Sequence, residues 1–185
     1  IEKVAKVGMP LLIIFGVVLA VRGLTLGTSG ASDIFPDANA WDGLNFLWTP
    51  HYESILDLKV WMAAAGQIFF TLSVGMGTIH CYAAYIDSKD DIALNAVSAG
   101  FMNEFVEVVL GSLIVIPIAA GYLGLDWVIQ NAGFGMAFQT MPYLFQQWGS
   151  TLAIIAGVCW FGLLFFAGIT SSLAMGTPWM GFMRD

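Results

Sequence analysis

The chain has 185 residues, of which 58% are hydrophobic and only 10% are charged, and its mean hydropathy is +0.81. A soluble domain carries about 25% charged residues, so this composition predicts an integral membrane protein whose main partner is the lipid bilayer. The formal net charge of −7, together with the lack of a basic patch in the sequence, excludes nucleic acid as a partner.

The first predicted span covers residues 7–26, with Pro10 near its start and Arg22 near its end. Proline is acceptable in a first helical turn because its missing N–H would be unpaired there anyway. Residues 28–58 follow as a long acidic and aromatic connection. Structureless loops of that length are uncommon, so we expect some local structure in it.

The second predicted span, residues 60–85, contains the stretch Thr-Leu-Ser-Val-Gly-Met-Gly-Thr at its centre, from Thr71 to Thr78. Glycine weakens a helix interior, and Ser and Thr hydroxyls compete for backbone hydrogen bonds. A straight helix with a close-packing glycine face is the alternative, but Gly75 and Gly77 are two residues apart rather than four. We therefore predict a helix broken at mid-membrane depth, where freed carbonyls can bind a cation and freed N–H groups suit a carboxylate.

The third predicted span, residues 94–122, places Asn103, Glu104 and Glu107 inside an apolar run. Carboxyl groups inside a membrane are costly and are a functional hypothesis by default. Asn103 and Glu107 are four residues apart and share a helix face, whereas Glu104 points about 100° away. An inter-helix hydrogen bond is the structural alternative for Glu104.

A second long connection covers residues 123–149, and its pattern suggests short helices joined at a bend. It could lie over a vestibule as a lid, or rest at the membrane interface. The fourth predicted span, residues 150–183, contains Pro178, which we expect to end or kink the helix.

Neutral oxygens gather at mid-membrane depth on three of the predicted helices. Hard cations prefer oxygen ligands, so these groups together predict a sodium site. The alternative for the fourth span is a hydroxyl bonded to a carbonyl one turn back in its own helix. The oxygen-bearing side chains are those of Thr71, Ser73, Asn103, Thr170 and Ser171.

The distribution of basic residues predicts the orientation. Four spans put both ends of the chain on one side of the membrane, together with Lys3, Lys6, Lys89 and Arg184, while only Arg22 and Lys59 lie on the other. The positive-inside rule then places the termini in the cytoplasm and residues 28–58 and 123–149 outside. We expect a multi-pass protein of the inner or plasma membrane.

Four strings carry a resemblance: GLNFLWTP (43–50), GQIFFTLSVGMG (66–77), NEFVEVVLG (103–111) and LLFFAGITSS (163–172). Through them the sequence resembles the neurotransmitter:sodium symporter family, particularly its prokaryotic amino-acid transporters. The resemblance implies an all-α, polytopic transmembrane protein with the inverted-repeat symporter fold. This chain would be an internal fragment holding the fifth to eighth of twelve helices, which needs the missing helices as partners. It leaves the oligomeric state open, with a homodimer as one alternative.

The resemblance implies sodium-coupled transport of an amino acid, a small-molecule substrate, with no enzymatic activity. It assigns a first sodium ion to Thr71 and Asn103, and a second to Ala167 (carbonyl), Thr170 and Ser171. Gln67 and Phe70 correspond to positions at the outer gate. The implied substrate-binding positions are Phe70, Thr71, Ser73, Met76, Ser171 and Met175.

At two positions this sequence differs from the pattern of the family it resembles, and both differences refine the expectation. Glu107 stands where chloride-dependent animal relatives have serine, and a fixed carboxylate can replace the charge of chloride, so we predict chloride independence. Met76 replaces an aromatic residue and, with Phe70 and Met175, favours a hydrophobic amino acid. The alternatives are an ion channel or receptor-like membrane protein, or a non-transporting fragment that lacks the first helix.

Overall fold

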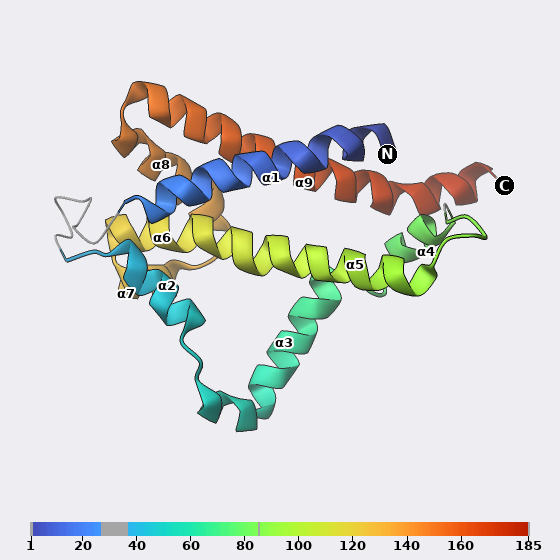
Figure 1. Cartoon of the computed structure of the whole chain (residues 1–185), viewed down its shortest axis with the longest axis horizontal. Helices are drawn as coiled ribbons and strands as arrows, with labels where there is room; N and C mark the ends of the chain where they lie inside the picture. The colour runs from blue at the N-terminus through green and yellow to red at the C-terminus, as the bar shows by residue number, and fades with distance from the viewer. Residues whose placement is uncertain (1, 27–36, 85, 185) are drawn as a thin grey trace.

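The computed structural model describes residues 2–26, 37–84 and 86–184, and within these ranges every regular element is helical (Figure 1). The all-α class predicted from the sequence is confirmed. In chain order the elements are α1 (Glu2–Leu24), α2 (Ala40–Trp48), η1 (Tyr52–Leu56), α3 (Leu58–Thr71), α4 (Thr78–Ala83), α5 (Ile92–Glu104), η2 (Phe105–Gly111), α6 (Ser112–Leu123), α7 (Leu125–Asn131), η3 (Met136–Thr140), α8 (Met141–Phe145), η4 (Gln146–Trp148) and α9 (Ser150–Arg184).

Among the described residues, three helical stretches are long and apolar enough to cross a membrane: Lys3–Leu24, Ile92–Leu123 and Ser150–Met183. The first of them, in α1, packs along α9 and against α6, and the second runs without a gap through α5, η2 and α6 (Figure 1). The predicted second span is not among them, because it is interrupted. Hydropathy and family resemblance place the protein in a membrane.

The buried core lies around α6, where Ile118, Ala119 and Ala120 are completely shielded from solvent. Met141 and Phe145 of α8 reach the same cluster and are 0% and 1% exposed. Through α8 the connection over 123–149 therefore packs into the core, while its Phe134 is 87% exposed. Its place as a lid or at the membrane interface stays a prediction.

Pro10 and Pro178 both lie inside helices, so Pro10 departs from the prediction and only the kink predicted for Pro178 stays a prediction. Because α1 begins at Glu2, Pro10 sits inside the helix rather than in its first turn. Pro178 does not end its helix, since α9 continues to Arg184. Membrane helices tolerate such prolines because neighbouring groups satisfy the freed carbonyls.

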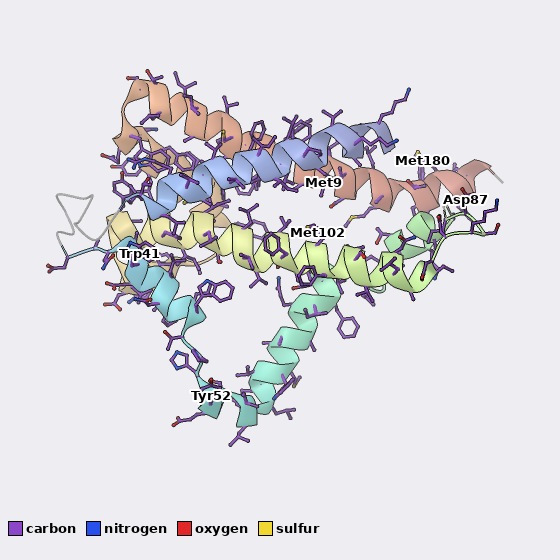
Figure 2. All side chains as sticks on the ribbon, viewed as in Figure 1. Met9, Trp41, Tyr52, Asp87, Met102 and Met180 are labelled. Carbon is purple, nitrogen blue, oxygen red and sulfur yellow. The ribbon has the colours of Figure 1, made fainter. Side chains whose placement is uncertain are left out.

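Residues 28–36 of the first long connection lie outside the described residues, and the rest of it has the local structure expected. Asn39 caps α2 by accepting a hydrogen bond from the Trp41 N–H at 2.9 Å. The chain then leaves the bundle toward exposed Tyr52 and returns along α3 (Figure 2). Asp57 caps α3 by accepting from the Lys59 N–H at 2.9 Å. These caps fix where α3 begins, and so where its far end meets α5.

Glycine at position 43 lets α2 approach α6 closely. A Cβ at Gly43 would lie 2.6 Å from Ile116 Cγ2 and 2.9 Å from Ala120 Cβ. We expect Gly43→Val to destabilise the protein by roughly 1–3 kcal/mol, the usual cost of overpacking. The melting temperature of the full-length protein in detergent measures this. Gly157→Val in α9, where a Cβ meets nothing within 4 Å, is the matched control, and equal melting of the two variants would contradict the prediction.

Candidate functional site

The interruption predicted in the second span is present between Thr71, where α3 ends, and Thr78, where α4 begins. Three residues inside it have left-handed backbone conformations: φ is 54° at Ser73, 84° at Gly75 and 79° at Gly77. Glycine adopts this conformation without cost, which explains the two glycines. Serine at a left-handed position costs about 1–2 kcal/mol, so the surrounding bonds must hold it there.

Those bonds form a helix-ending Schellman motif. The Ser73 N–H donates to the Phe70 carbonyl at 3.0 Å, and the Val74 N–H donates to the Phe69 carbonyl at 2.9 Å. This pattern satisfies two of the last carbonyls of α3 and turns the chain away. Thr78, only 2% exposed, donates its hydroxyl to the Ser73 carbonyl at 3.4 Å. The break is thus a defined structure that begins directly after Thr71 and ends where α4 starts at Thr78.

The segment that contacts the end of α3 beside this break is a π-helix, which was not predicted from the sequence. Residues Phe105–Gly111 are wound as π-helix between α5 and α6. Such segments are rare and occur frequently at functional sites. Asn103 lies in the last turn of α5 and Glu107 in the π segment. The wider winding changes the direction of side chains after Glu104, yet Asn103 and Glu107 both reach α3.

Four polar side chains meet there in one hydrogen-bonded network. The amide of Gln67 donates to one oxygen of Glu107, and the hydroxyl of Thr71 donates to the other. Asn103 donates its amide to the Thr71 hydroxyl oxygen at 2.9 Å. The carboxylate therefore accepts two bonds from α3, while no basic side chain of the described residues forms an ion pair with it. The network brings together four of the predicted site residues.

This arrangement suits a cation. Asn103 donates one amide N–H to the Thr71 oxygen, and Thr71 donates its O–H to Glu107. The Asn103 amide oxygen and one remaining lone pair of the Thr71 oxygen are therefore left as neutral ligands. The Glu107 charge beside them offsets part of the cost of bringing a dehydrated cation to this depth. Gln67, predicted only as a gate-associated residue, holds the carboxylate in position.

The residues predicted for a second sodium ion lie on α9, which packs against α1 and α4. The Thr170 hydroxyl donates to the carbonyls of Phe166 at 3.0 Å and Ala167 at 3.1 Å. The Thr170 hydroxyl proton is therefore used as the structural alternative describes, in a hydrogen bond to a carbonyl about one turn back in the same helix. Its oxygen lone pairs and the exposed Ser171 remain able to bind a cation.

The predicted substrate-pocket residues do not form an enclosed site in the described part of the chain. Phe70, Met76 and Met175 are 68%, 46% and 51% exposed, and Ser73 is half-buried. Oε1 of Glu104 is shielded from solvent and accepts no hydrogen bond from the described residues. The inter-helix bond considered for Glu104 therefore stays a prediction.

Comparisons with known proteins decide the family. A sequence profile of the sodium:neurotransmitter symporter family matches residues 2–180. The chain belongs to this family. An uncharacterized sodium-dependent transporter of Methanocaldococcus jannaschii is 30% identical over 180 residues, which cover 95% of this chain and 34% of that protein. The sodium-dependent neutral amino acid transporter B(0)AT2 of Pongo abelii is 32% identical over 109 residues, covering 57% of this chain and 15% of that protein.

A third relative is the human sodium- and chloride-dependent transporter XTRP3, which is 29% identical over 92 residues, covering 50% of this chain and 14% of that protein. The chain spans about a third of the length of the archaeal relative, and a bacterial sodium-dependent transporter of Haemophilus influenzae is covered to the same extent. The matched family is one of symporters, not of enzymes.

Proposed function

We propose that this chain is part of a sodium-coupled symporter that moves amino acids by alternating access. The supporting observation is the network in which Asn103, Thr71 and Glu107 place two neutral oxygen ligands beside one negative charge. Membership of a sodium symporter family and relatives named as sodium-dependent transporters agree with it. Thr71 and Asn103 would ligate the first sodium ion, which enters as co-transported substrate.

The second sodium ion is assigned to Ala167, Thr170 and Ser171. The Ala167 carbonyl and the two hydroxyl oxygens lie within one turn and a half of α9, so they present neutral oxygens on one stretch of helix. Further ligands would come from other segments of the full-length protein.

Transport would not require chloride. The Glu107 carboxylate is fixed by Gln67 and Thr71, so a negative charge of the protein already lies beside the first cation position. A mobile anion would add a second negative charge next to it, which electrostatic repulsion disfavours.

The substrate would be a hydrophobic amino acid. Phe70 lies just before the break and Met76 within it, and Met175 lies on α9, which packs against α4 beyond the break. These side chains supply apolar surface, and methionine adapts to the shape of its partner. The polar groups near these apolar side chains are those at the C-terminal end of α3 and the hydroxyl of Ser73. The substrate carboxylate would complete the first sodium site.

The protein would lie in the inner or plasma membrane with the start of α1 and the end of α9 in the cytoplasm. Both lie at the same end of the molecule, together with the turn between α4 and α5 (Figure 1). Lys3, Lys6 and Lys89 belong to that end, which fits the positive-inside rule.

Uptake by the full-length protein in proteoliposomes tests this function. We expect hydrophobic amino acids to accumulate when an inward sodium gradient is imposed, and equally well when gluconate replaces chloride. Potassium in place of sodium should abolish uptake. Sodium current that does not depend on any amino acid would instead favour an ion channel, and a strict chloride requirement would contradict the role given to Glu107.

A further inference from the structure

Trp160 joins α9 to the connection that precedes it. Its side chain is only 4% exposed, and its indole N–H donates to the Ala137 carbonyl in η3 at 2.9 Å. The ring also meets Phe145 of α8 edge-on, with ring centroids 6.2 Å apart and an interplanar angle of 74°. One side chain of α9 therefore contacts two successive elements of the connection.

The Ala137 carbonyl needs this donor for a reason that lies in the local sequence. In an α-helix its partner would be the N–H of Met141, but η3 is wound as a π-helix and that N–H bonds to the Met136 carbonyl. In the π pattern its partner would be the N–H of residue 142, which is proline and has none. Pro142 and the π winding together take away both helical donors, and the indole of Trp160 replaces them.

The same face of α9 carries residues assigned to the second sodium ion. The helix is continuous from Ser150 to Arg184, and Ala167 and Ser171 follow Trp160 by seven and eleven residues. At about 3.6 residues per turn, both positions lie within roughly 20° of Trp160 around the helix axis, and about 10 and 16 Å further along it. A rotation of α9 at Trp160 is therefore passed on to these ligands.

We propose that Trp160 is a positioning residue for the second sodium ion. By bonding to η3 and packing against Phe145, it fixes the rotation of α9 about its axis, and with it the direction of the Ala167 carbonyl and the Ser171 hydroxyl. An ion that must be dehydrated binds tightly only where its oxygen ligands are already held in place. This inference rests on the proposed function, because it needs the second sodium ion assigned there.

Binding of radiolabelled sodium to the purified full-length protein tests this. Amino acid is left out, because its carboxylate is proposed to complete the first sodium site. Trp160→Phe keeps the aromatic contact and removes the N–H, so the sodium concentration for half-saturation should rise about threefold to tenfold, the size expected for one neutral hydrogen bond. Trp127→Phe is the matched control, since Trp127 also packs against the core but its indole N–H donates no hydrogen bond within the described part of the chain. Unchanged half-saturation in Trp160→Phe, or an equal shift in both variants, would overturn the proposal.

A double variant separates positioning from the loss of a bond alone. Pro142→Ala supplies an N–H at the position that pairs with the Ala137 carbonyl in a π-helix. In Trp160→Phe/Pro142→Ala the carbonyl can be bonded again, but η3 is no longer tied to α9, so sodium binding should stay as weak as in Trp160→Phe. Recovery of the half-saturation of Pro142→Ala would show that Trp160 only satisfies a carbonyl, which overturns the proposal. If the wild type itself bound no sodium, the proposed function would fail as well, so the two failures are distinguishable.

Discussion

Replacing Glu107 with serine is expected to make uptake by the full-length protein dependent on chloride. The substitution removes the negative charge and leaves the amide of Gln67 and the hydroxyl of Thr71 without their acceptor. Hydrogen bonds to a charged group contribute roughly 1.5–3 kcal/mol each, and about 1.4 kcal/mol corresponds to a factor of ten. Sodium-driven uptake in chloride-free buffer should therefore fall about tenfold or more, and added chloride should restore it.

Two further variants separate a charge effect from damage to the fold. Glu107→Gln keeps the shape but is neutral and fills the space that an anion would need, so its uptake should be low with or without chloride. Glu53→Ser removes a carboxylate from the exposed segment η1 and should behave like the wild type in both buffers. Equal uptake by Glu107→Ser with and without chloride would contradict the role of this carboxylate.

The break in the second span could be predicted because its cause is local. Two glycines with positive φ and a run of hydroxyl side chains lie within eight residues, and such residues oppose a continuous helix wherever they are placed. That Ser73 rather than a glycine takes the first left-handed position could not be predicted, because bonds to Phe69 and Phe70 carbonyls hold it there.

The π-helix could not be predicted from hydrophobic periodicity. Periodicity identifies winding only where a helix has one polar and one apolar face. The stretch Phe105–Gly111 is apolar except for Glu107, so one turn of different winding leaves no mark in the pattern. The spacing of Asn103 and Glu107 nevertheless predicted that they act together. Despite the changed winding, both side chains still reach Thr71 at the end of α3.

The remaining features that could not be predicted from the sequence depend on contacts between distant segments. The bond from Gln67 to Glu107 joins residues 40 apart, and Arg22 of α1 lies over the ring of Trp148 in η4. Nothing in the local sequence pairs these positions. The exposure of Phe70 and Met76 likewise depends on which segments cover them, so a list of pocket residues could be predicted but an enclosed pocket could not.

Removing the Asn103 amide is expected to weaken sodium dependence selectively. In Asn103→Ala the sodium site loses one neutral oxygen, and the Thr71 hydroxyl loses the donor that orients it. The sodium concentration for half-maximal uptake should rise about tenfold or more, which corresponds to about 1.4 kcal/mol. Asn95→Ala, an exposed asparagine two turns earlier in α5, is the matched control and should leave sodium dependence unchanged.

A double-mutant cycle then tests whether Thr71 and Asn103 act on the same ion. Thr71→Val removes the hydroxyl with little change of shape and should also raise the sodium requirement. The two side chains are hydrogen-bonded to each other at 2.9 Å, so their effects on the sodium requirement should not add. The double variant should need little more sodium than the single variant with the higher sodium requirement. Independent, additive effects would place the two residues at separate positions and remove the physical basis for a shared cation site at the break.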